Sequence, residues 1–211
     1  MEVFEAVRTV LAVREYRDKP VSPETVRRIV EAGRLTGSSM NRQPWHFIVV
    51  QNRDILRQLG ALAKTGPYVR QAALAIVVAM QRTPFAVSDG SRAIQSMMLT
   101  AWSEGVGSNW VGFMGMKDVK PLLGIPDDLD VLAIIPLGYR ARPVGKGQKN
   151  RKPLSPRWPT SSGSDGLFND PTAKLLVPVR ILELGANVSV CSMPRVTPGE
   201  REITDKSLIA S

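Results

Sequence analysis

The sequence predicts an α+β fold. Segments with the 3.6-residue spacing of amphipathic helices occur between short apolar segments typical of strands, and they do not follow a regular βαβ repeat. The chain has 211 residues, of which 43% are hydrophobic and 22% charged, as expected of a soluble domain. The longest apolar run, Ala72–Met80, is far shorter than the roughly 20 residues that span a bilayer. We therefore expect a soluble protein with one main core.

Helix signals occur at five places. A helix is predicted over residues 2–12, and another begins at the capping residue Ser22 and stops near Gly37. A third covers Asp54–Lys64 behind the capping residue Asn52. The longest begins at Ser88-Asp89 and closes at Gly105, and the shortest covers Lys117–Leu123 and ends at Gly124. The predicted strands are His46–Val50, Ala72–Met80, Trp110–Met114 and Val131–Leu137.

Composition excludes several kinds of chemistry. The single His46 and the single Cys191 cannot form a His/Cys metal cluster or a disulfide framework, so we expect no metal site and a reducing compartment. Glu2 and Glu5 stand where a secretory signal would be basic, which favours a cytoplasmic protein. The 28 Lys and Arg against 19 Asp and Glu give a net charge of +9, which is compatible with nucleic-acid binding. The basic residues are spread along the chain, however, and we expect neither nucleic acid nor membrane as a partner.

Three polar or glycine-rich groups are candidates for binding. Residues 38–45 (SSMNRQPW) carry hydroxyl and amide groups that could hold the polar edge of a heteroaromatic ligand, or form only a turn. Residues 105–112 (GVGSNWVG) allow a close backbone approach, or form a structural turn. Basic residues near both ends of the first 155 could converge on a phosphate, or be solvated surface: Arg8, Arg14, Lys146, Lys149, Arg151 and Lys152.

In their order and spacing these groups resemble the nitroreductase family of flavin mononucleotide (FMN) enzymes. The resemblance covers about residues 1–155 and is carried by the following stretches: Val13-Arg14-Glu15-Tyr16, Ser38-Ser39-x-Asn41-x-Gln43-Pro44-Trp45-x-Phe47, Asp89…Ala93-x-Gln95, Gly105-x-Gly107-Ser108-x-Trp110, Leu123-Gly124-Ile125-Pro126, Leu137-Gly138-Tyr139 and Arg151-Lys152-Pro153-Leu154.

The resemblance implies a mainly antiparallel sheet flanked by helices, and a homodimer with FMN between the subunits. It implies that Arg14, with Arg8 as a further candidate, contacts the FMN phosphate or ribityl chain, and that Arg151 returns to the phosphate with Lys149 or Lys152. It also implies flavin contacts from the backbone at Val111-Gly112 and from the side chains of Ser38, Ser39, Asn41 and Gln43. The implied reaction is ping-pong hydride transfer from NADH or NADPH through flavin N5 to a nitroaromatic, a quinone or a related acceptor, with no catalytic side chain.

Two departures from the family pattern stand out. Residues Val10, Leu11 and Ala12 replace the Arg-Arg-Ser that is often found before the position of Arg14, which places the chain in a divergent branch. The pattern also stops at Ser155. One permitted set of codons for residues 156–168, read from its third base, encodes an ending that resembles the family's usual one. We hypothesise that residues 156–211 are translated out of frame and poorly ordered; the alternative is a natural extension with a strand at Val177–Leu184.

Two alternatives to an enzyme follow from the same residues. A non-catalytic flavin-binding or sensory protein would use the same flavin contacts. A basic nucleic-acid-binding domain would need its charge on one face. Residues 156–211 hold six basic and six acidic residues, so the whole excess of +9 lies in residues 1–155. That distribution favours a field that attracts the FMN phosphate and anionic nicotinamide donors.

Overall fold

A computed structural model describes residues 1–112, 116–143, 149 and 151, together with the backbone of two strands at 180–184 and 188–192. Its strands form one sheet in the order β3-β4-β2-β1-β6-β5, and every neighbouring pair is antiparallel. This confirms the predicted α+β class. The strands are β1 (Trp45–Val50), β2 (Leu74–Gln81), β3 (Val106–Ser108), β4 (Leu129–Tyr139), β5 (Arg180–Leu184) and β6 (Val188–Ser192).

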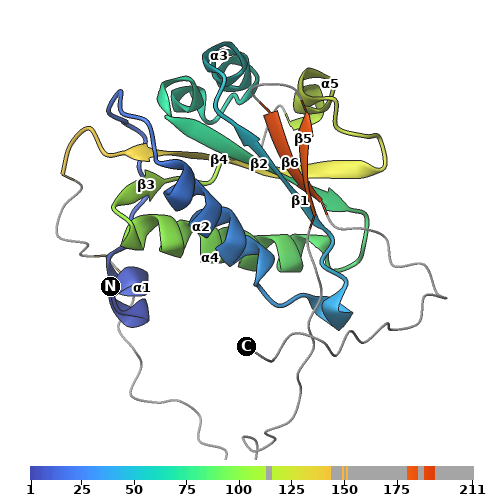
Figure 1. Ribbon diagram of the computed structural model, residues 1–211, viewed down its shortest axis with the longest axis horizontal. Coiled ribbons are helices and arrows are strands. Elements are labelled where there is room, and N and C mark those ends of the chain that lie inside the picture. The colour runs from blue at the N-terminus through green and yellow to red at the C-terminus, as the bar shows by residue number, and fades with distance from the viewer. Residues whose placement is uncertain (113–115, 144–148, 150, 152–179, 185–187, 193–211) are drawn as a thin grey trace, which may run out of the picture.

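Helices cover both faces of the sheet (Figure 1). The helices α2 (Pro23–Arg34) and α4 (Ala86–Ser103) lie below it in that view, whereas α3 (Arg53–Leu62) and α5 (Val119–Leu123) lie above it. The short helix α1 (Val3–Thr9) packs against α4 through Ala6 and Trp102. Three short 3-10 turns complete the described elements: η1 (Ser39–Asn41), η2 (Pro67–Gln71) and η3 (Met116–Asp118).

The central strand explains the apolar run in the sequence. On β2, Leu74, Ile76 and Val78 point into the core between the sheet and helices α2 and α4. Ala75 and Val77 point to the other face, into the core between the sheet and α3. All five side chains are fully buried. Because both faces of the strand are covered, it is apolar from Leu74 to Met80 and does not alternate with polar residues.

The predicted helix signals are largely confirmed. The side chain of Ser22 accepts from the Thr25 N–H at the start of α2, and Asn52 accepts from two N–H groups at the start of α3. Gly124 ends α5 in the left-handed conformation, with φ of 62°. Several predicted ends were wrong by two or three residues. Helix α1 stops at Thr9 and not at residue 12, and α2 stops at Arg34, before Gly37, with Leu35 as its cap. Helix α3 stops at Leu62 and not at Lys64, and α5 begins at Val119 and not at Lys117.

Two other predictions need correction. Helix α4 begins at Ala86, so Ser88-Asp89 is not its cap, and the Asp89 side chain has another partner. Residues 110–112 are not a strand: Val111 makes one isolated bridge to Ile134, and 113 and 114 lie outside the described residues. The third strand is instead the glycine-containing β3, which pairs with β4.

The C-terminal segment contributes β5 and β6, and β6 pairs with β1. The strand predicted at Val177–Leu184 for a natural extension overlaps β5, although its first three residues lie outside the described residues. The rest of residues 156–211 also lies outside them, so poor order there stays a prediction. The out-of-frame origin of this segment is tested by the coding DNA.

Candidate functional site

The segment that carries Arg14 is fixed against the edge of the sheet. The Val13 N–H donates to the Ser108 carbonyl of β3 at 2.9 Å, and the buried Tyr16 hydroxyl donates to the Val13 carbonyl at 2.8 Å. The Val13 side chain packs on Gly107, where a Cβ atom would lie only 2.5 Å from it. Since Val13 and Tyr16 point inward, Arg14 between them is exposed.

The other predicted phosphate ligands lie around the end of α1. The Lys149 Nζ donates to the carbonyl of Val7 in the last turn of α1, so a residue far along the chain returns to the N-terminal helix. Partial burial and, after it, the Arg151 charge lower the pKa of Lys149. Arg8, on the same helix turn as Val7, is held by Glu5 in an exposed ion pair of 2.7 Å. We call Arg8, Arg14, Lys149 and Arg151 the cationic group; Lys146 and Lys152 lie outside the described residues.

Residues Ser38–Gln43, which we call the polar loop, follow α2 and precede β1. Three of its non-glycine residues are left-handed: Met40, Asn41 and Gln43 have φ of 54°, 52° and 49°. Such a conformation costs roughly 1–2 kcal/mol for a residue with a side chain. The loop therefore keeps this conformation only if other contacts offset its cost.

Contacts inside the polar loop supply part of that fixation. The Gln43 N–H donates to the Ser38 Oγ at 2.8 Å, and the Gln43 side-chain amide donates to the carbonyl and the Oδ1 of Asn41, both at 3.2 Å. Because the Ser38 Oγ already accepts one hydrogen bond, its own O–H remains to be donated. Asn41 is exposed, and Ser38 and Gln43 are half-buried, so all three can be reached by a ligand.

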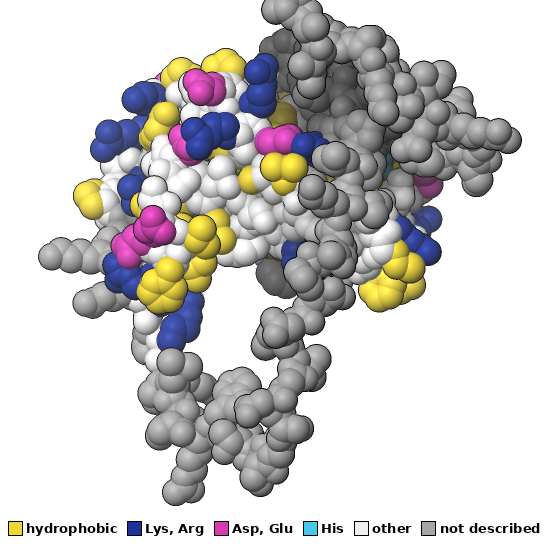
Figure 2. Space-filling model, turned by 60° about the horizontal axis from the view of Figure 1, so that its bottom comes forward, with side chains coloured by type: hydrophobic (Ala, Val, Ile, Leu, Met, Phe, Trp, Pro, Cys, Tyr) yellow, Lys and Arg dark blue, Asp and Glu magenta, His cyan; other side chains and the backbone are white. Residues whose placement is uncertain are grey.

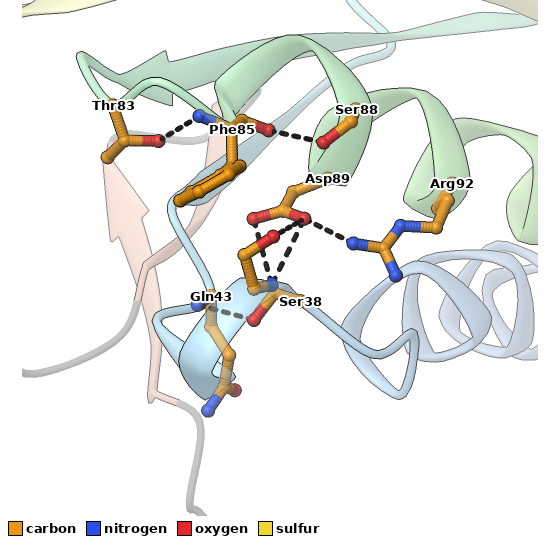
Figure 3. A network of polar contacts seen from close by, with 8 residues as sticks. Ser38, Gln43, Thr83, Phe85, Ser88, Asp89 and Arg92 are labelled. Carbon is orange, nitrogen blue, oxygen red and sulfur yellow. Dashed lines mark hydrogen bonds and ion pairs between the residues drawn. The ribbon is translucent and has the colours of Figure 1, made fainter.

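A buried carboxylate holds the remaining part of the loop (Figure 3). Asp89, only 1% exposed, accepts from the Ser39 N–H on both oxygens at 3.1 Å and from the Ser39 hydroxyl at 3.0 Å. Arg92, one turn further along α4, pairs with the same carboxylate. The Ser39 hydroxyl is thus directed into the protein.

The backbone at Val111-Gly112, for which a flavin contact is predicted, lies against strand β4. The N–H and the carbonyl of Val111 bond to Ile134 at 3.0 and 2.7 Å, and its side chain is buried with that of Val69 in the core under α3. At Gly112 a Cβ atom would lie 2.6 Å from the Trp110 Nε1. Within one chain, the backbone N–H and carbonyl of Val111 are therefore already hydrogen-bonded to β4.

The cationic group and the polar loop lie at opposite ends of the helical layer in Figure 1. The end of α1 lies at the left of the view, whereas η1 lies at the right, beyond the end of α2. The twelve residues of α2 alone span about 18 Å, from the rise of an α-helix. One chain does not bring the two groups together.

Large exposed apolar side chains occur beside both groups. Val3 and Phe4 on α1 are 75% and 76% exposed, and Met40 and Phe85 beside the polar loop are 66% and 41% exposed. Figure 2 shows apolar side chains on the left of this face, on the side of α1, and separately on its right. Such patches are typical of surfaces that a ligand or another subunit covers.

Together these groups offer a defined chemistry. Cationic side chains are the groups that hold a phosphate dianion in proteins, and hydroxyl and amide groups are those that bind the polar edge of a planar ring. Among the described residues, no three His, Cys, Asp or Glu side chains lie close enough to hold a metal ion. No helix in that part of the chain is long and apolar enough to cross a membrane. His46 lies in β1, where burial lowers the pKa of its imidazole and its Nε2 has no hydrogen-bond partner.

Comparison with known proteins identifies the family of the chain. The model of the nitroreductase family matches residues 8–92 and 64–139. The "Putative NADH dehydrogenase/NAD(P)H nitroreductase" of Methanothermobacter thermautotrophicus is 35% identical over 154 residues, which is 69% of this chain and 81% of that protein. The chain belongs to the nitroreductase family and is a nitroreductase-like oxidoreductase.

Two solved structures extend the similarity to the fold. The FMN-dependent nitroreductase of Clostridium difficile has a TM-score of 0.64 at 26% identity and covers 67% of this chain and 89% of its own. A "putative nitroreductase in complex with FMN" from Desulfovibrio desulfuricans has a TM-score of 0.62 at 30% identity. The match covers 73% of this chain and 93% of that chain.

Sequence reasoning gave Asp89 only the role of a helix start and gave Arg92 no role. Their signal is an acid followed by an arginine three residues later on a helix, a pattern that is common on solvated helix faces. Only the fold shows that the acid is buried and that Ser39, fifty residues earlier, is its partner.

Proposed function

We propose that this chain is an FMN-dependent oxidoreductase that takes hydride from NADH or NADPH and passes electrons to a nitroaromatic, a quinone or a related acceptor, in ping-pong turnover. When bound, FMN supplies the hydride-accepting and hydride-donating chemistry. The observation that carries the proposal is the polar loop, in which Ser38, Asn41 and Gln43 remain accessible and are held in a strained shape beside exposed apolar side chains. The nitroreductase relatives support the same conclusion.

The residues of this chain fit FMN by their chemistry. Arg14, Lys149 and Arg151 would hold the phosphate, with Arg8 joining them if it leaves Glu5. Ser38, Asn41 and Gln43 would bind the polar edge of the ring. Phe85 and Met40 would supply an apolar surface for a planar ring.

We propose further that the protein acts as a homodimer with FMN between the subunits. The support is the separation of the cationic group from the polar loop: two copies related by a twofold axis would place the loop of one beside the cations of the other. The exposed Val3 and Phe4 of α1 provide apolar surface that a second copy would cover.

The absorbance spectrum of the purified protein tests the proposal. We expect a yellow protein that is bleached anaerobically by NADH or NADPH and recoloured by a nitroaromatic or a quinone. Bound flavin that neither nicotinamide bleaches would indicate a non-catalytic flavin-binding protein. A colourless protein that does not take up added FMN would contradict the proposed function.

A further inference from the structure

We propose that Asp89 is a positioning residue, which holds the polar loop in its ligand-binding shape before the flavin arrives. The inference rests on the proposed function for the identity of the ligand, since it assigns the loop to the flavin ring. The contact between Asp89 and the loop is a property of the chain itself.

The burial of Asp89 is the first observation. A side chain with a negative charge that is 1% exposed must be compensated by hydrogen bonds or a countercharge. Asp89 receives both, from the N–H and hydroxyl of Ser39 and from the guanidinium of Arg92. Figure 3 shows the carboxylate between the loop on one side and Arg92 on the other. An ionised carboxylate accepts all these bonds, whereas an amide of the same shape would present N–H donors to some of them.

The position of Ser39 is the second observation. It stands directly before Met40 and Asn41, which are both left-handed, and directly after Ser38, whose hydroxyl accepts from Gln43. Fixing Ser39 therefore fixes the point where the chain enters its strained part. A loop that is held in the binding shape loses less freedom when a ligand binds, which strengthens binding without any new contact.

The third observation is that the carboxylate of Asp89 is covered by Ser39 and Arg92. Because it is only 1% exposed, it would act through the loop and not by touching a ligand. Loss of its charge should weaken every ligand that uses the loop by the same factor, whether or not the ligand carries a phosphate. Loss of a phosphate-binding cation should instead weaken FMN more than riboflavin.

The test compares Asp89→Asn with Asp54→Asn. Asp54 is a matched control, because it also pairs with an arginine three residues later in the first turn of a helix but is 72% exposed on α3. We expect Asp89→Asn to raise the dissociation constants of FMN and riboflavin at least about tenfold, with their ratio unchanged. Asp54→Asn should leave both constants as they are. Unchanged binding by a folded Asp89→Asn protein would overturn the inference.

A measurement on the unaltered protein covers the case in which Asp89→Asn does not fold. The Ser39 amide should exchange its hydrogen slowly without flavin, because a buried carboxylate accepts it. Rapid exchange of this amide, at the rate of an exposed loop, would also overturn the inference. A wild-type protein that binds no flavin would contradict the proposed function, while slow exchange at Ser39 would still show a fixed loop.

Discussion

Replacing Arg14 with alanine tests the assignment of the phosphate site. Arg14 is exposed, and among the described residues it forms no ion pair, so its removal should not change the fold. Its neighbours Val13 and Tyr16 keep the segment in place through their contacts with β3 and β4. The variant therefore isolates the loss of one cation from the cationic group.

The magnitude follows from the kind of bond that is lost. A hydrogen bond to a charged group contributes about 1.5–3 kcal/mol. Its loss should raise the dissociation constant of FMN roughly 10- to 150-fold, since 1.4 kcal/mol is a factor of ten. Riboflavin has no phosphate, so its dissociation constant should change little. The loss for FMN should shrink at high salt, because ions screen an exposed contact.

Fluorescence titration of the apoprotein with FMN and with riboflavin measures both constants. Arg57→Ala is a suitable control, because Arg57 is an exposed arginine on α3, on the opposite face of the sheet from α2. Equal weakening of FMN and riboflavin by Arg14→Ala, or no weakening of either, would refute the assignment of Arg14 to the phosphate.

Three further predictions concern stability and the elements that position the site. Burial lowers the pKa of His46 below its ordinary 6.5, so the unfolded chain binds the proton more readily than the folded chain. The free energy of unfolding should therefore fall as the pH drops below about 6.5. Urea unfolding should show a smaller fall for His46→Gln, and an equal dependence of the free energy on pH in both proteins would count against this. Gly107→Ala should lower both the unfolding midpoint and FMN affinity, because the new Cβ would lie 2.5 Å from the Val13 side chain. An unchanged midpoint would show that the Val13 side chain can move away without cost. Asn52→Ala should reduce the free energy of unfolding by about 0.5–2 kcal/mol through the lost cap of α3, with FMN affinity unchanged; a change in FMN affinity would place α3 nearer the site.

Local sequence signals predicted most of the fold. The cap residues Ser22 and Asn52 and the left-handed Gly124 each act on neighbours within a few residues, so their effect is visible in the sequence. Strand β3 was missed because Val106–Ser108 is too short and too rich in glycine to show a strand pattern. Its pairing with β4, thirty residues later, makes it a strand.

The residue types of the candidate site can be read from the sequence, whereas their arrangement cannot. The polar loop and the cationic group were both identified, because hydroxyl, amide and basic side chains are visible in a sequence. Asp89 was interpreted as a helix cap, since the pair Ser88-Asp89 is typical of a helix start. Its burial depends on tertiary structure, and its contact with Ser39 joins residues fifty positions apart. No local pattern contains that information.

Anaerobic titration of the FMN-reconstituted protein with NADH and with NADPH is the decisive test of the proposed oxidoreductase activity. We expect one FMN bound per chain, loss of the flavin absorbance with one of the two nicotinamides, and its return when a nitroaromatic or a quinone is added. A protein that does not bind FMN, or a bound FMN that neither nicotinamide reduces, would contradict it.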